Sequence, residues 1–185
     1  DRSVSRGLGD VYKRQRYPVS LGITDEHGRG HLIDATRALG EQLNMWGHPP
    51  LSSVILTHAH VGHVDGLGLF GRETLNARGI KLYASQSMHS LIEQTPQWAL
   101  MLNQGVFETE VTASGRVHAL SETVRLEAVE VPHRAELSDM HAFIVRGPNR
   151  SVLYLTDHDR WDDTLNHHDV PSIRAWLKDL DVDLA

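Results

Sequence analysis

Apolar and polar positions along the chain follow two patterns, one typical of strands and one typical of helices. Short apolar runs bounded by turn residues indicate strands, and apolar residues three or four positions apart indicate helices. The pattern predicts strands over residues 17–24, 31–35, 53–57, 80–84, 106–111, 116–120, 124–131, 141–146 and 152–156. It predicts helices over residues 36–46, 67–78, 85–94 and 172–180. Strands interspersed with helices favour sheets covered by helices, an α/β or α+β layered architecture.

Residues 1–16 fit neither pattern. They hold five of the 18 basic residues and lack the apolar core of a signal peptide. We interpret them as a non-native leader, with a disordered basic tail as the alternative. Residues 17–185 are then expected to form one partial domain that is truncated at its C-terminal end, because residues 181–185 resemble the opening of a buried strand.

Composition and charge narrow the function classes. A length of 185 residues predicts one domain, and the net charge of −6 argues against a nonspecific nucleic-acid binder. No apolar run approaches the roughly 20 residues of a membrane span. We therefore expect a small-molecule substrate, no nucleic acid and no membrane span, while oligomeric state and compartment stay open.

The chain has no cysteine but 13 histidines, which directs attention to nitrogen and oxygen ligands. The lack of cysteine excludes disulfides, thiolate metal sites and a cysteine nucleophile. Histidine is the commonest metal ligand and titrates near neutral pH.

Three of the histidines follow a predicted buried strand. Val54-Ile55-Leu56 is an unbroken apolar run and leads into Thr57-His58-Ala59-His60-Val61-Gly62-His63. Side chains two residues apart in an extended segment point to the same side, so His58 and His60 can face one point beyond the strand. Three histidines plus solvent make an open catalytic zinc site, and the third ligand must come from elsewhere.

Two later strands end in residues of the same kind. His133 follows the strand over residues 124–131, and Asp157 follows the strand over residues 152–156. Three strands that each deliver a metal-type ligand indicate one metal site. The alternatives are a turn histidine at position 133 and an Asp157 that caps the segment starting at Arg160.

The His58-x-His60-x-x-His63-x-x-Gly66 pattern resembles the metallo-β-lactamase superfamily motif, written His-x-His-x-Asp-His-x-x-Gly. Leu32-Ile33-Asp34-Ala35, Val131-Pro132-His133 and Leu155-Thr156-Asp157 are similar to the early strand and the later ligand segments of the family. Gly-His-x-x-Gly-Leu, followed by Gly-Arg-Glu and Asn-Ala-Arg-Gly, resembles the branch of coenzyme PQQ synthesis protein B. The resemblance implies an αββα sandwich over about residues 17–185, with metals at one edge of two facing sheets.

Two departures from the family motif change the expected metal site. Gly62 stands where the family has a ligating Asp, and the family's last His ligand lies beyond the strand at which this chain ends. The resemblance therefore implies an intact first position and a second position reduced to His63 and Asp157. We expect one tightly bound Zn²⁺, with Fe or Mn as alternatives, held by ligands from the set His58, His60, His63, His133 and Asp157.

Several residues keep more than one interpretation. His63 is a ligand, a hydrogen-bond partner of a ligand or a helix cap. Asp65 replaces the missing carboxylate, hydrogen-bonds a ligand histidine or caps the helix after Gly66, and the cap is favoured. Asp34 is a partner of a ligand rather than a ligand.

The leading hypothesis is a metal-dependent hydrolase with Asp157, His63 and Asp65 as the candidate catalytic residues. Zinc would lower the pKa of bound water from about 15.7 to about 7 and polarise the substrate. Asp157 would orient this water, and His63 would assist the leaving group. The substrate stays open because one fold hosts many activities. The alternatives are an iron-dependent oxygenase like PQQ-B and a degenerate, non-catalytic metal-binding relative.

Overall fold

The computed structural model describes residues 17–185, so the interpretation of residues 1–16 lies outside the described residues. Within the described part, the strands form two sheets. The strands are β1 (Leu21–Thr24), β2 (Gly30–Ile33), β3 (Leu51–Ile55), β4 (Ile80–Ala84), β5 (Phe107–Val111), β6 (Val117–Ala119), β7 (Arg125–Glu130), β8 (His141–Arg146) and β9 (Ser151–Tyr154). The helices are α2 (Leu39–Trp46), α3 (Val61–Val64), the 3-10 helix η1 (Leu67–Phe70), α4 (Gln86–Gln94), α5 (Pro96–Asn103), α6 (Trp161–His167) and α7 (Ile173–Asp179).

The first sheet has the order β1-β2-β3-β4-β5 and is parallel apart from β1. Parallel neighbours need long crossovers, which α2, the α3–η1 segment and the α4–α5 pair supply. As a result, the carboxyl ends of β2, β3 and β4 lie at one edge of the sheet. The polar residues that follow these strands are thereby brought to the same edge.

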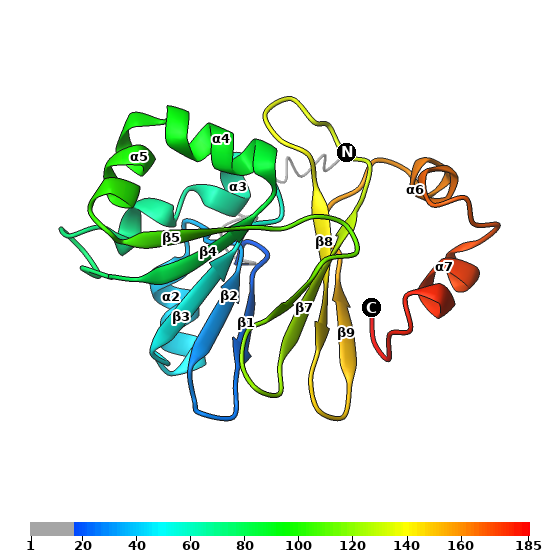
Figure 1. The fold of residues 1–185 in the computed structure, drawn as a ribbon, viewed down its shortest axis with the longest axis horizontal. Coiled ribbons are helices and arrows are strands. Elements are labelled where there is room, and N and C mark those ends of the chain that lie inside the picture. Colours follow the sequence, from blue (N-terminus) through cyan, green and yellow to red (C-terminus); the bar gives the residue numbers. More distant parts are fainter. Residues whose placement is uncertain (1–16) are drawn as a thin grey trace, which may run out of the picture.

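The second sheet is antiparallel, with the order β6-β7-β8-β9, and it faces the first sheet (Figure 1). The core between the sheets contains apolar side chains from both. These are Ile33, Ile55 and Tyr83 from the first sheet and Val124, Leu126, Ala128, Phe143 and Val145 from the second sheet or its margin. Alternate side chains of β2 and β3 point the other way, so both strands are buried on two faces, as the unbroken run Val54-Ile55-Leu56 predicts for β3.

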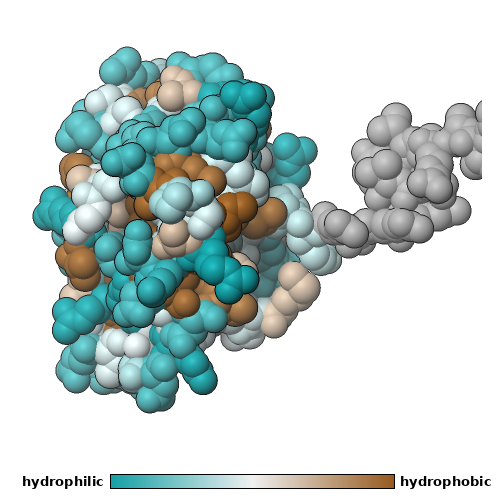
Figure 2. Space-filling model, turned by 90° about the vertical axis from the view of Figure 1, so that its right-hand side faces the viewer, coloured by the Kyte–Doolittle hydropathy of each residue, from teal (hydrophilic) through white to brown (hydrophobic). Residues whose placement is uncertain are grey.

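Helices cover the outer face of each sheet, which gives the four layers expected for an αββα sandwich. The α2, α4 and α5 helices pack on the first sheet, and Trp176 of α7 is buried against the second (Figure 1). The face that carries α6 and α7 shows hydrophobic surface among hydrophilic side chains (Figure 2). In the core around Trp176, the apolar residues of α6, α7 and the segments beside them, such as Leu165, Leu177 and Leu180, are only partly buried. The layered α/β architecture predicted from the sequence is confirmed.

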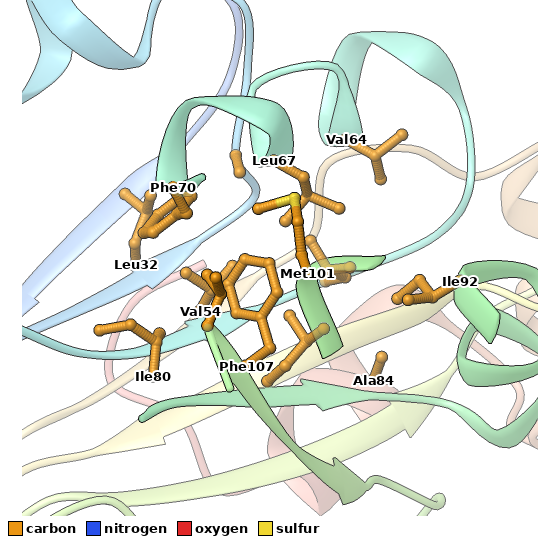
Figure 3. Packing of buried hydrophobic residues seen from close by; sticks show 14 of the residues in the cluster. Leu32, Val54, Val64, Leu67, Phe70, Ile80, Ala84, Ile92, Met101 and Phe107 are labelled. Carbon is orange, nitrogen blue, oxygen red and sulfur yellow. The ribbon is translucent and has the colours of Figure 1, made fainter. Parts of the chain in front are cut away.

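The core between the first sheet and the helices that cover it also anchors the segment that carries His58, His60 and His63. Val64, Leu67 and Phe70, which follow the three histidines, are at most 2% exposed and point into this core (Figure 3). Phe70 packs against Phe107 of β5, with ring centroids 5.4 Å apart. Full burial of such a side chain stabilises the fold by about 1.5–3 kcal/mol, so the loop is fastened at its C-terminal end.

The helix predicted over residues 67–78 is wrong beyond Phe70. The structure has the short helix η1 there, followed by turns that continue to Gly79. Gly71 adopts an extended conformation and Asn76 has a φ of 48°, and neither geometry continues a helix. Glycine weakens helices, and Gly66, Gly68 and Gly71 occur within six positions, so the apolar spacing alone was misleading.

Three helices were not predicted, the single turn α3 and the helices α5 and α6. Helix α5 begins with Pro96 at its first turn, a position that favours proline because the missing N–H would have no partner there. Helix α6 begins at Trp161, in the segment starting at Arg160 for which the sequence suggested only Asp157 as a cap. The predicted strand opening at residues 181–185 forms a single parallel bridge between Leu184 and Val152 of β9.

We predict that Gly66→Ala destabilises the protein strongly. A Cβ on Gly66 would lie 2.1 Å from the carbonyl oxygen of Thr36, and backbone cannot move aside as a flexible side chain can. The loss should reach about 3 kcal/mol, the upper end for overpacking, and appear as a lower denaturant midpoint. Gly68→Ala is the control because a Cβ there meets no atom within 4 Å. Equal midpoints for the two variants would contradict this explanation of the motif glycine.

Candidate metal centre

Residues that follow three different strands meet at one edge of the sandwich. His58 and His60 follow β3, His133 follows β7, and Asp157 follows β9. Each offers one ligand atom, and these four atoms all lie within 4.8 Å of one another. The structure therefore brings together four of the five residues predicted as metal ligands. We call them the four-residue group.

The distances within the four-residue group match those around one metal ion. His60 Nδ1 lies 2.8 Å from His58 Nε2 and 3.2 Å from His133 Nε2. Asp157 Oδ2 lies 3.8 Å from His58 Nε2 and 3.6 Å from His133 Nε2. Tetrahedral ligands at zinc are about 3.3 Å apart, given metal–nitrogen distances of about 2.0–2.1 Å. The spacing thus fits a tetrahedral ion with a carboxylate on one side.

Hydrogen bonds on the far side of His58 fix which of its nitrogens faces the centre. Thr57 Oγ1 lies 2.9 and 3.0 Å from the two carboxylate oxygens of Asp34, to which the hydroxyl donates. The Thr57 oxygen is then an acceptor for His58 Nδ1, 3.0 Å away. With the proton on Nδ1, the Nε2 lone pair points at the centre.

His60 and His133 are oriented in the same way by carboxylates. His60 Nε2 lies 3.1 Å from Glu136 Oε2, and His133 Nδ1 lies 3.1 Å from Asp159 Oδ1. An ionised carboxylate only accepts hydrogen bonds, so both outer nitrogens carry the proton. Three imidazole lone pairs therefore converge within hydrogen-bond distance with no donor between them, and this arrangement fits a cation.

The electrostatic surroundings keep His58 available as a ligand. Burial lowers the pKa of His58 to about 3, and the neighbouring His63, His60 and His133 rings act in the same direction. A metal ligand must be unprotonated, and a low pKa supplies that form at neutral pH. The side chain is 2% exposed, so little solvent reaches the ring.

His63 lies beside the four-residue group but outside it. Its ring centroid is 4.3 Å from that of His58, and its Nε2 is 3.7 Å from Asp157 Oδ2. Its Nδ1 is 2.7 Å from Asp34 Oδ2. Burial opposes a charge on His63, but the hydrogen bond and the charge of Asp34 outweigh it and raise the pKa. His63 is therefore suited to holding a proton next to Asp157.

Asp34 organises the inner side of the site without joining the four-residue group. It is fully buried, has a φ of 62°, and accepts hydrogen bonds from the amide and hydroxyl of Thr57 and from His63. One carboxylate thus links β2, the segment after β3 and helix α3. The sequence predicts Asp34 to be a partner of a ligand rather than a ligand.

Asp65 and Gly62 contribute no ligand atom to the four-residue group. Asp65 occupies the C-cap of α3, and its carboxylate is 3.1 Å from Nε of Arg37. It is not in the four-residue group, so its predicted catalytic role is not supported by a place among the candidate ligands. A side chain at Gly62 would meet open space, and α3 supplies no carboxylate toward His63.

Three site residues were missed by sequence reasoning. Glu136, Asp159 and Ser138 hold the backbone or the outer nitrogens of the ligands. The sequence signal that could have found two of them is proximity in the chain, since Glu136 and Asp159 lie within three residues of a proposed ligand. Many surface carboxylates do so, and this signal therefore has little specificity.

A second group of described residues, Glu26, His27 and Glu122, is also close enough to share an ion. All three are exposed, and Glu26 already accepts hydrogen bonds from the hydroxyls of Ser121 and Thr123. Exposed acidic groups often approach one another in this way. The four-residue group, in which His58 is buried and the other three residues are half-buried, is the better candidate.

Comparisons with known proteins agree with the fold and the site. A family model for the beta-lactamase superfamily domain matches residues 29–184. The anti-Pycsar protein Apyc1 of Bacillus phage vB_BsuM-Goe3 is 30% identical over 105 residues, which are 54% of this chain and 39% of the phage protein. This chain therefore spans well under half the length of that relative.

Two solved structures show the same fold. Zn²⁺-bound PqqB from Methylobacterium extorquens superposes with a TM-score of 0.63 at 16% identity, covering 77% of this chain and 54% of that chain. A diphosphatase of the PhnP family superposes with a TM-score of 0.58 at 22% identity, covering 77% of this chain and 53% of that chain. With the family match over most of the chain, they confirm the resemblance seen in the histidine motif: this chain belongs to the metallo-β-lactamase superfamily.

Proposed function

We propose that this chain carries the metal centre of a metal-dependent hydrolase that acts on a small-molecule substrate. The observation that supports the proposal is the convergence of three imidazole lone pairs and one carboxylate at the edge of the sandwich. The superfamily fold and its association with zinc in PqqB agree with it. In the described residues, no helix is long and apolar enough to cross a membrane.

His58, His60 and His133 would hold one Zn²⁺, with Asp157 as a fourth ligand or as the carboxylate that orients solvent. The donors are nitrogen and oxygen only, which also suits Fe(II). His63 would stay beside the ion rather than hold a second one, because Gly62 contributes no carboxylate on that side. One tightly bound ion per chain follows from this donor set.

When bound, Zn²⁺ supplies Lewis acidity that polarises a substrate oxygen and makes water a nucleophile near neutral pH. Asp157 would accept a hydrogen bond from the attacking water and so fix its direction. His63 would donate the proton on Nε2 to the leaving group, since its pKa is raised by Asp34. Asp34 would keep the ring of His63 in place through its 2.7 Å hydrogen bond to Nδ1.

The test of this proposal is the metal content of the purified protein in zinc-supplemented buffer, with iron and manganese measured in parallel. We expect about one ion per chain in the wild type and almost none in the His58→Ala/His60→Ala double variant, because two of the three nitrogens are lost. His167→Ala is the matched control, since this exposed histidine lies on α6. A metal-free wild type would refute the metal centre.

Turnover is tested separately with ester, lactam, thioester, diphosphate and phosphodiester substrates. The metal-loaded wild type should hydrolyse at least one class, and the double variant none. Iron in place of zinc together with oxygen uptake would favour an oxygenase. A metal-loaded longer form of the protein that turns over none of these substrates would leave metal binding and refute hydrolysis.

A further inference from the structure

Residues 57–59, which carry the first proposed ligand His58 and lead to the second, His60, are held by groups from distant parts of the chain. They lie beyond the end of β3, where ladder hydrogen bonds no longer hold them. The Thr57 amide donates to Asp34 Oδ1 at 2.9 Å, and its carbonyl oxygen accepts from the His141 amide at 3.0 Å. The Ala59 amide, between the ligands His58 and His60, is buried and also needs an acceptor.

Ser138 supplies that acceptor. Its Oγ accepts from the Ala59 amide at 2.9 Å and donates to the carbonyl oxygen of Asp139, also at 2.9 Å. An amide only donates and a carbonyl oxygen only accepts, so both contacts are satisfied in one hydroxyl orientation. Ser138 is 6% exposed, and water therefore competes little for these bonds.

Asp139 connects this contact to a helix. Its carboxylate accepts hydrogen bonds from the hydroxyls of Ser85 and Ser87, and its amide donates to Ser87 Oγ at 3.1 Å. Ser85 is the N-cap of α4 and accepts from the Met88 amide at 3.2 Å. The position of Ser138 is thus fixed by α4, which packs on the first sheet.

We infer that Ser138 is a positioning residue for the metal centre. By holding the Ala59 amide, its hydroxyl sets the spacing between His58 Nε2 and His60 Nδ1. Ser138 lies on the β7–β8 connection that also carries His133 and Glu136, so one connection supplies a ligand, a partner for His60 and this anchor. The inference rests on the proposed function, because the spacing matters only if an ion is held there.

The test compares Ser138→Ala with Ser138→Thr and with Ser151→Ala. Ser151 is a matched control, because it is 7% exposed and its hydroxyl also links a backbone amide, that of Asp183, to a backbone carbonyl, that of Asp181. It starts β9, away from the four-residue group. The readouts are zinc affinity by chelator competition, the visible spectrum of the Co²⁺-loaded protein, and hydrogen exchange at the Ala59 amide without metal.

We expect Ser138→Ala to bind zinc about 10–100-fold more weakly, the range typical of partners that orient ligands, with an altered Co²⁺ spectrum. Exchange at the Ala59 amide should accelerate, and Ser138→Thr, which keeps the hydroxyl, should restore all three readouts. Ser151→Ala should lose stability while zinc affinity and spectrum stay unchanged.

Two results would overturn the inference alone: wild-type zinc affinity and spectrum in Ser138→Ala, or an equal loss of affinity in Ser151→Ala. A wild type that binds neither metal would refute the proposed function and the inference with it. Because the wild type and the variants are measured side by side, the two failures are distinguishable.

Discussion

Adding Zn²⁺ to the metal-free protein is expected to raise its midpoint of thermal unfolding by about 10 °C. A ligand that binds only the folded state at 1,000 times its dissociation constant stabilises that state by about 4 kcal/mol. For a chain of this size, each kcal/mol corresponds to roughly 2–4 °C. The gain is specific to the folded state because the four ligand atoms come from three separate strand ends and meet only there.

The matched variants for this titration are His133→Ala and His167→Ala. The first removes one of three converging nitrogens and should lose most of the shift, while the second removes an exposed imidazole and should keep it. An equal shift in the wild type and in His133→Ala would place the stabilising ion elsewhere, for instance at the exposed Glu26, His27 and Glu122 group.

The strands were predicted well because their signals are local. The buried strand β3 has an unbroken apolar run, and its side chains Val54 and Ile55 enter the two cores on opposite faces. The η1 segment shows where such reasoning fails, since apolar spacing alone suggested a long helix across Gly68 and Gly71. The backbone conformation at Gly71 and Asn76 decided the outcome there.

The meeting of the four-residue group could be anticipated from the sequence, although the ligand roles stay a prediction. His58 and His60 are near one another in the chain, but His133 and Asp157 are far from them and reach the centre only through the order of strands. Their predicted positions at strand ends are enough to imply that they meet, because the ends of strands in two facing sheets lie at one shared edge.

The partners that orient the ligands could not be anticipated in the same way. Glu136 and Ser138 act through the conformation of the β7–β8 connection, and Asp159 acts through a turn after β9. Loop conformation and side-chain rotamers have no periodic signal in a sequence. The same holds for Asp65, whose ion pair with Arg37 depends on the path of the chain before α2.

Replacing Asp157 by Asn is expected to reduce turnover by about 100-fold or more on any substrate that the metal-loaded wild type hydrolyses. Asn has the same shape but no charge, so the variant tests the carboxylate rather than the packing. Asp157 Oδ2 lies 3.6–3.8 Å from nitrogens of His133, His63 and His58. Loss of a group that orients or deprotonates water typically costs about 10²–10⁴-fold in rate.

The substitution acts on a second proposed catalytic residue as well. The charge of Asp157 contributes to the raised pKa of His63, so its removal should lower that pKa and reduce the protonated fraction near neutral pH. The acidic side of the pH–rate profile should then contribute more of the remaining activity, because His63 regains its proton there. Zinc should still bind through the three histidines, at lower affinity.

The control for this prediction is Asp163→Asn on α6, whose carboxylate pairs with Arg160 outside the four-residue group. It should leave both turnover and zinc content unchanged. If Asp157→Asn retained wild-type turnover with its metal in place, Asp157 would be neither the carboxylate that directs water nor a charge needed to keep His63 protonated. The ion held by the three histidines would then have to act on water without a carboxylate from the four-residue group, because Asp157 is the only carboxylate in that group.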